Sequence, residues 1–225
     1  NPDRIVLGGI DSRTLEAMDK LYAIFSDVDV IRTTPKTAEM IKYTANSLLA
    51  TLISFSNEIG NLCAVLGNID VVEVMSGVHL DHRLSPILDN GQRITPVLNT
   101  YLAAGCGFGG SCFPKDVKAL VAHGNQYRIP MPLLESVLKI NELQPHKVID
   151  LLERHIPNLS GVRVAVLGLA FKPGTDDMRE SPAIPIVKYL LDHGATVRAF
   201  DPVAAEEARK VFGDNTIAYA ERLTY

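Results

Sequence analysis

Cysteine is scarce in this sequence, and the features that mark secreted and membrane proteins are missing. Three cysteines in 225 residues, an odd number, do not form a disulfide framework. No run of 18 apolar residues is present, as a membrane span would require, and the first residues lack the charged and then apolar pattern of a secretory signal. These absences favour a cytoplasmic protein that does not span a membrane.

Strong charge of one sign is also lacking. The net charge of −4 argues against a nucleic-acid-binding protein. A hydrophobic content of 47% allows a sizeable core, and the length fits one or two domains. Because the sequence starts without methionine and ends at Tyr225 in the middle of a pattern, we expect a piece of a longer protein.

The first half of the sequence predicts one unusually long helix. A short strand at residues 5–7 and a helical stretch at 14–25 come first, and the Thr-Thr-Pro sequence at 33–35 then gives a helix start. Between Lys36 and Ile59 there is no glycine or proline, and apolar residues recur at helical spacing. If the helix tolerates Gly60 and ends at Gly67, its length is on the order of 50 Å. Such a helix predicts a packing partner, and so a homodimer.

The pattern of the sequence changes near residue 157. Before it we expect helices near residues 70–75, 114–123 and 132–155, the last interrupted by Pro145, with an irregular stretch at 77–100. After it, a strand at 163–169, a helix at 181–191, a strand at 196–200 and a helix at 204–211 predict a βαβ unit with a buried parallel strand. The predicted fold class is α plus α/β. An N-terminal segment (1–31) leads into a helical central dimerisation domain (32–156) and a partial Rossmann-like parallel α/β domain (157–225).

Residues 107–116, Gly-Phe-Gly-Gly-Ser-Cys-Phe-Pro-Lys-Asp, carry the strongest chemical signal. Cys112 follows a glycine-rich turn and precedes a predicted helix start, and the amide groups of such a start and the nearby Lys115 favour a thiolate. The glycines allow the backbone to approach a ligand closely. A structural, buried role is the usual one for a free cysteine and fits Cys63, in an apolar helical run, while Cys106 stays undecided.

The long helix carries a second candidate. Lys42 and Asn46 are four residues apart, so both side chains can reach one reacting oxygen, although such a pair is more often a solvated helix face. Asn57 and Asn61 repeat the spacing, and we interpret them as ordinary polar positions or interface contacts.

Residues 168–182 run from a predicted strand end through a Gly/Pro turn into a helix start, where α/β sheets bind ligands. Lys172 and Arg179 are candidates for phosphate contacts or for a solvated loop. Helix caps or ion-pair partners are expected at Asp176, Asp177 and Glu180.

Two kinds of site are not predicted. A GxGxxG fingerprint is missing, so the sequence shows no complete dinucleotide-binding unit. His79 and His82 flank Asp81, but four suitable ligands are not assembled nearby, and a solvated turn is the favoured interpretation.

Three features follow one another along the chain: the helix with Lys42 and Asn46, the cysteine loop, and the segment Leu-Gly-Leu-Ala-Phe-Lys-Pro-Gly-Thr-Asp-Asp-Met-Arg-Glu-Ser-Pro. In this order they resemble the UDP-glucose/GDP-mannose dehydrogenase family, and most closely its bacterial UDP-glucose 6-dehydrogenases. The likeness covers nearly the whole chain. The family has an NAD-binding Rossmann domain, a helical central domain that dimerises through a long helix, and a C-terminal domain that binds the nucleotide sugar. By this likeness, the chain begins after most of the first domain and stops inside the last.

The resemblance implies an NAD-dependent, four-electron oxidation of UDP-glucose at C6. Cys112 would attack the intermediate aldehyde to give a thiohemiacetal, a second oxidation would give a thioester, and water would release the acid. Lys42 and Asn46 would stabilise the developing oxyanion, and Asp116 would orient or activate water. The alternatives are GDP-mannose as the substrate, or a nucleotide-sugar-binding and dimerisation fragment without turnover. Because the glycines of an NAD site are missing, the chain alone is expected to be inactive.

The same resemblance assigns binding residues. Contacts to the nucleotide sugar are expected from Tyr101, Gly109, Phe171 and Lys172, and contacts to NAD from Lys115 and Arg179. The family also has an arginine about sixteen residues before the cysteine, which reaches the substrate of the neighbouring subunit. Position 96 is proline here, and Arg93 or Arg83 is expected to fill the role across an apparent insertion.

Overall fold

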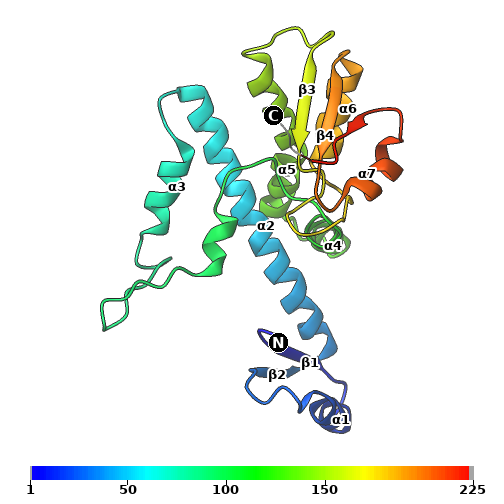
Figure 1. Ribbon diagram of the computed structural model, residues 1–225. Coiled ribbons are helices and arrows are strands. Elements are labelled where there is room, and N and C mark those ends of the chain that lie inside the picture. Colours follow the sequence, from blue (N-terminus) through cyan, green and yellow to red (C-terminus); the bar gives the residue numbers. More distant parts are fainter. Residues whose placement is uncertain (1, 223–225) are drawn as a thin grey trace. The chain divides into compact units, whose positions relative to one another are not determined.

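The structure, a computed structural model, describes residues 2–222 and consists of two compact units that divide between Leu48 and Leu49. The elements and their order along the chain are shown in Figure 1. Helices combine with small parallel sheets, as the sequence predicted.

The first unit is a small parallel α/β element. Strand β1 (Ile5–Gly8) pairs in parallel with β2 (Val30–Thr33), and α1 (Ser12–Tyr22) connects them. An ion pair of 2.8 Å between Arg32 and Asp19 ties α1 to β2. The sequence predicted β1 and α1, but not β2, whose four residues lie directly beside the signals for the next helix.

Helix α2 (Pro35–Leu66) is as long as the sequence predicted. Thr34 Oγ1 accepts the Thr37 N–H at 3.3 Å at its start, and at its end Gly67, with φ of +70°, donates its N–H to the Cys63 carbonyl. Gly60 lies inside the helix, where a Cβ would stand 2.8 Å from the Cβ of Ala104. The glycine therefore lets the neighbouring chain segment lie directly against α2.

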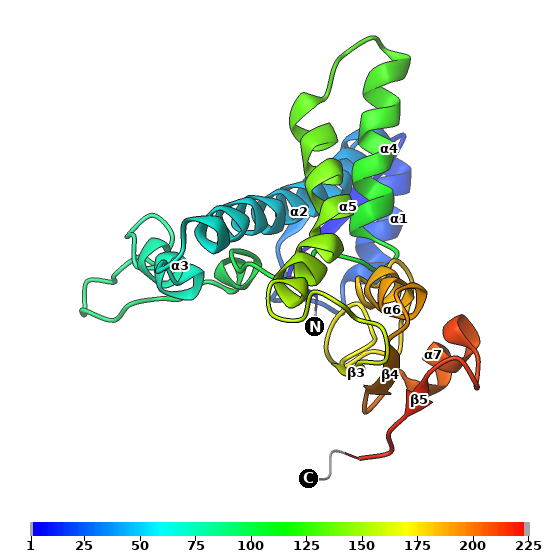
Figure 2. The same cartoon turned by 90° about the horizontal axis from the view of Figure 1, so that it is seen from above.

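The helical part of the second unit contains α3 (Val71–His79), the 3₁₀ helix η1 (Val97–Tyr101), α4 (Phe113–Gln126) and α5 (Pro132–Glu153). Figure 2 shows α4 and α5 side by side, and α5 also contacts α6. Pro145 is buried inside α5, which continues past it as one helix. The stretch expected to be irregular holds a short antiparallel hairpin, with Ile87 opposite Arg93.

The α/β part contains three parallel strands in the order β3 (Arg163–Leu167), β4 (Thr196–Phe200) and β5 (Ala218–Tyr219), with helices α6 (Ala183–Asp192) and α7 (Ala205–Phe212). Its core includes Leu169, Val187, Leu190 and Val197. The predicted full burial of the first strand is wrong, because alternate residues of β3 are exposed. Among the described residues β3 pairs with β4 alone, which leaves its other edge open.

Asp201, directly after β4, ties together the ends of two strands. Its Oδ2 accepts the N–H groups of Leu169 (2.8 Å) and Ala170 (3.1 Å), and its Oδ1 accepts those of Val203 (2.9 Å) and Ala204 (2.8 Å). Burial by itself would raise the pKa of Asp201, but these hydrogen bonds outweigh it and lower the pKa below its usual value. The carboxylate is thus the acceptor that holds the chain leaving β3 against the chain leaving β4.

We expect Asp201→Asn to lower the free energy of unfolding at pH 7 by about 2–4 kcal/mol, measured by urea denaturation. Hydrogen bonds to a charged group contribute roughly 1.5–3 kcal/mol, and an amide can accept on one side only. Because the folded-state pKa is depressed, this stabilisation is present above the unfolded value of 3.8 and is lost as the pH falls through the folded pKa. The difference from wild type should therefore narrow in acid.

The matched control is Asp192→Asn, at an exposed carboxylate of the same domain, which should leave stability unchanged. If Asp201→Asn were as stable as wild type at pH 7, the four hydrogen bonds would not hold the strand ends together.

Candidate active site

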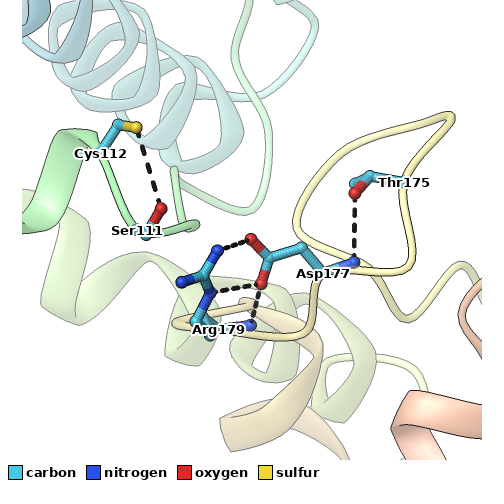
Figure 3. A network of polar contacts seen from close by, with 5 residues as sticks. All are labelled: Ser111, Cys112, Thr175, Asp177 and Arg179. Carbon is cyan, nitrogen blue, oxygen red and sulfur yellow. Dashed lines mark hydrogen bonds and ion pairs between the residues drawn. The ribbon is translucent and has the colours of Figure 1, made fainter.

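Cys112 lies at the N-terminus of α4 and is exposed. Its carbonyl accepts the Asp116 N–H at 2.9 Å, and its Sγ is 3.8 Å from Ser111 Oγ (Figure 3). Asp177 is the main cause of the raised pKa of Arg179, and the charge of Cys112 adds to it. The sulfur is therefore within electrostatic range of the Arg179 guanidinium group.

The other two polar residues of the predicted cysteine site lie in the first turn of α4. Asp116 is completely buried, and its Oδ1 is 2.5 Å from Lys115 Nζ, whose side chain is largely exposed. Because residues four apart lie on the same side of a helix, Asp116 follows Cys112 by one turn on one face of α4. The structure thus brings a thiol, a buried carboxylate and an ammonium group to one helix end.

The glycines before Cys112 pack against the segment that follows β3. The Gly110 N–H donates to the Arg179 carbonyl at 2.8 Å. A Cβ on Gly109 would stand 2.2 Å from the carbonyl oxygen of Glu180, and one on Gly110, where φ is +79°, would stand 2.7 Å from the Phe171 ring. Only glycine fits at these two positions, because backbone and ring already occupy the space of a side chain.

The segment after β3 is held by its own polar contacts. Phe171 donates its N–H to the Asp177 carbonyl at 3.1 Å, and Lys172 Nζ lies 5.2 Å from the centre of the Phe171 ring. Asp177 and Arg179 form a two-pronged ion pair, with distances of 2.9 and 2.7 Å, which Figure 3 shows. These side-chain hydrogen bonds are the main cause that lowers the pKa of Asp177 to about 2. The predicted ion-pair roles are confirmed for Asp177 and for Glu180, which pairs with Lys118 at 3.2 Å.

A cavity of about 670 Å³ opens beside β3 and at the carboxyl ends of β3 and β4. Phe171, Lys172, Thr175 and Asp201 line it together with the first residues of α6. Ligands of parallel α/β sheets bind at this end of the strands. The walls are mainly apolar, and Lys172 adds a cation to them.

Other residues predicted for the site come from α2 and η1. Lys42 and Asn46 share a face of α2 within the first unit, whereas the cysteine loop belongs to the second. Tyr101, at the end of η1, packs its ring 6.2 Å from that of Phe113, the residue after Cys112. Tyr101 is therefore in the immediate neighbourhood of the cysteine.

The two candidate arginines before the cysteine loop differ in their contacts. Arg93 Nη1 donates to the carbonyls of Leu80 and Ser85, both at 2.9 Å, and so closes its own loop. Arg83 binds the carboxylate of Asp81 in a two-pronged pair, and its side chain is 88% exposed.

The cysteines differ in the way that the sequence suggested. Cys63 is buried in α2, as predicted for a structural residue. Desolvation raises the pKa of the Cys106 thiol, even though part of this residue is exposed. Cys112, by contrast, is exposed at the start of α4.

Amide side chains form a part of the site that the sequence interpretation missed. The Gly105 N–H donates to Asn57 Oδ1 at 2.7 Å, and Gln144 Nε2 donates to the Gly105 carbonyl at 2.8 Å. Asn61 Nδ2 in turn donates to Gln144 Oε1 at 3.0 Å. Asn57 is fully buried, and nothing in the surrounding sequence distinguishes it from a solvated asparagine, so no local signal marked it.

We expect Gly109→Ala to lower the free energy of unfolding by about 1–3 kcal/mol, since the clashing partner is backbone and cannot move as a flexible side chain would. Urea denaturation measures the change. Gly77→Ala is the control, because a Cβ at this position of α3 meets nothing within 4 Å and alanine favours the helix. A Gly109→Ala protein as stable as wild type would show that the two loops can separate at no cost.

Two family models match the chain. The model for the central domain of the UDP-glucose/GDP-mannose dehydrogenase family matches residues 36–143, and the model for the UDP binding domain of the same family matches residues 165–224.

Individual relatives agree with this match. A UDP-glucose 6-dehydrogenase of Haloferax volcanii is 41% identical over 98% of this chain and 48% of its own length, and one of Bacillus subtilis is 39% identical over 98% and 45%. The solved structure of a UDP-glucose dehydrogenase from Pyrobaculum islandicum has a TM-score of 0.86 at 41% identity, covering 99% of this chain and 48% of that one. A UDP-D-ManNAc dehydrogenase structure from Pyrococcus horikoshii has a TM-score of 0.73 at 28% identity, over 92% and 47%. The chain spans about half the length of the curated relatives it matches.

Proposed function

The chain belongs to the UDP-glucose/GDP-mannose dehydrogenase family, and on that premise we propose that the complete protein oxidises the C6 alcohol of UDP-glucose to the carboxylate in two NAD-dependent steps. The observation that carries the proposal is the exposed Cys112 at the start of α4, packed through Gly110 against the Arg179 segment. UDP-glucose is the proposed substrate because the relatives at about 40% identity carry that name, whereas the UDP-D-ManNAc dehydrogenase structure is 28% identical.

Cys112 supplies the covalent step. The first oxidation removes a hydride and a proton from the C6 alcohol and leaves an aldehyde, which the Cys112 thiolate attacks to form a thiohemiacetal. Loss of a second hydride from this adduct gives a thioester, and water then cleaves the carbon–sulfur bond to release the acid and the thiol. When bound, NAD accepts one hydride in each oxidation. Sulfur suits these reaction steps because a thiolate is both a good nucleophile and a good leaving group.

The neighbouring polar residues stabilise charge and direct water. We assign Lys42 and Asn46 to the oxyanion that develops at C6, since an ammonium and an amide on one helix face can donate to one oxygen. Asp116, one helical turn after Cys112, is assigned to orient or activate the water that cleaves the thioester. Its burial beside Lys115 keeps the carboxylate in one position.

The cavity at the carboxyl ends of the strands is the proposed site of the nucleotide sugar. Lys172 would place its charge at the pyrophosphate, and Phe171 lines the same cavity. Gly109, three residues before Cys112, and Tyr101, which packs against Phe113, would contact the sugar near the cysteine. Lys115 and Arg179 are cations beside the cysteine and are the residues that would meet the phosphates of NAD.

In the full-length protein we expect Cys112→Ser to lower the rate of NADH production from UDP-glucose by roughly a hundredfold or more, because a serine hydroxyl is a weak nucleophile without an adjacent base. Lys172→Ala should instead raise KM with a smaller effect on kcat, since its contact to pyrophosphate is present in both ground and transition states. Steady-state NADH absorbance measures both parameters. Near-normal turnover by Cys112→Ser would refute the covalent mechanism.

Helix α2 carries the proposed dimer interface. Leu48, Phe55, Leu62 and Leu66 are exposed large apolar residues that recur every seven or four positions and so form one stripe along the helix. By length and composition α2 would also pass as a membrane-spanning helix. Its buried Ser54 donates to the Val137 carbonyl on α5, so we assign α2 to the protein core and to an interface between two copies in the cytoplasm.

We expect the 225-residue chain to sediment at micromolar concentration with twice its monomer mass of 24.5 kDa. The double variant Phe55→Glu/Leu62→Glu should sediment as a monomer, because charges on the stripe cannot be buried against a second copy. The matched control is Leu133→Glu, at an exposed leucine of α5, which should stay dimeric. A monomeric wild-type chain would rule out the interface.

Arg83 is the arginine that we assign to the substrate of the neighbouring subunit. Its guanidinium extends from an exposed turn, whereas Arg93 uses Nη1 to close its own loop. Asp81 orients the Arg83 guanidinium, and the same contact is the main cause that lowers the pKa of Asp81.

A further inference from the structure

We propose that Asn141 is a positioning residue for Cys112, because its amide fixes the backbone from which the cysteine loop starts. The inference rests on the proposed function and deepens it, because it adds a residue that acts on the reactive cysteine through the backbone of the loop. Asn141 lies on α5 and reaches the loop across 33 residues of sequence.

The Asn141 amide spans both polar groups of one backbone residue. Its Oδ1 accepts the Phe108 N–H at 2.7 Å, and its Nδ2 donates to the Phe108 carbonyl at 2.9 Å. A pair of hydrogen bonds to one residue imitates a step of a β-ladder and fixes the direction of the chain as well as its position. One hydrogen bond would leave the chain free to rotate about it.

Phe108 transmits this fixation toward the cysteine. Its side chain is buried in the core of α4 and α5, and its ring meets the ring of Phe113 edge to face at 6.0 Å. Phe113 directly follows Cys112. The loop is thus anchored by Asn141 four residues before the sulfur and by the aromatic contact one residue after it.

The neighbouring residues leave room for this contact and extend it. Gly107 has φ of +101°, and a Cβ there would stand 2.7 Å from Asn141 Oδ1, so the glycine admits the amide. One turn along α5, Gln144 binds the Gly105 carbonyl, while Asn57 of α2 binds the Gly105 N–H. Two helices therefore hold the approach to the loop through side-chain amides.

Loss of the Asn141 amide should displace the sulfur without removing the site. After Phe108, the next hydrogen bond that holds the backbone of the loop is donated by the Gly110 N–H to the Arg179 carbonyl. This bond remains when the Asn141 amide is removed. Helix α4 keeps its own packing through the fully buried Val117. A displacement of about 1 Å at a reacting atom can lower a rate about a hundredfold.

The test uses the full-length protein, with NADH production from UDP-glucose as the assay. We expect Asn141→Ala to lower kcat by about ten- to a hundredfold, with KM for UDP-glucose within about threefold of wild type. Asn125→Ala, at an exposed asparagine of α4, is the matched control and should leave both parameters unchanged. A rise in KM without a fall in kcat would overturn the inference, as would an unchanged kcat.

A second variant and a second measurement guard against simple misfolding. Asn141→Asp keeps the volume and the acceptor for the Phe108 N–H but sets a carboxylate against the Phe108 carbonyl, so kcat should also fall at least tenfold. Hydrogen exchange in the 225-residue chain should be at least tenfold faster at the Phe108 and Gly110 amides of Asn141→Ala and unchanged at Val117. Equal acceleration at Val117 would show general loosening and would overturn the positioning role.

The outcomes separate the two proposals. A wild-type protein that does not oxidise UDP-glucose with NAD would overturn the proposed function and this inference with it. An active wild type whose Asn141 variants behave like Asn125→Ala would overturn this inference alone.

Discussion

The close approach of two backbones at Gly109 and Glu180 is the constraint on which the rest of the site depends. At Gly109 no side chain separates the cysteine loop of the helical part from the segment that leaves β3, because the Glu180 carbonyl occupies the space of a Cβ. Glu180 itself has φ of +52°, which is uncommon for a residue other than glycine and persists where the surroundings determine it. The ion pair with Lys118 and the bond from Gly110 to the Arg179 carbonyl supply those surroundings. The distance between the thiol and the segment that leaves β3 is thereby set by backbone packing.

Local signals in the sequence were enough to predict the helices and the class of the fold. The Thr-Thr-Pro start and Gly67 bound α2 correctly, because caps and turns are encoded within a few residues. The expected interruption at Pro145 does not occur, because α5 continues past this residue. Strands β2 and β5 were not predicted, since strands of four and two residues are defined by their pairing more than by their composition. For β3 the apolar run shows the capacity for burial, but the open edge can be seen only once the neighbouring strands are placed.

The candidate site likewise contains some residues that the sequence could predict and others that it could not. Cys112, Lys115 and Asp116 could be predicted because glycine, cysteine, proline and charge cluster within one loop and the first turn of a helix. The amides could not, because their chemistry depends on contacts over long separations. Asn141 meets Phe108 across 33 residues, and Asn57 meets Gly105 across 48, and neither asparagine differs in sequence from a solvated one. The contacts of Arg93 with the carbonyls of Leu80 and Ser85 likewise could not be predicted, because they depend on how the loop folds back on itself.

The uninterrupted α2 makes chain length a constraint of its own. Ser54, Asn57 and Asn61 lie within about 60° of one another around the helix axis, at 3.6 residues per turn. Each makes a hydrogen bond within the second unit, to Val137, Gly105 and Gln144 respectively. Substitutions between them leave this alignment intact, whereas insertion or deletion of one residue between Ser54 and Asn57 would rotate Ser54 against the two asparagines by about 100°. In this stretch of α2 the number of residues is therefore more tightly constrained than their identity.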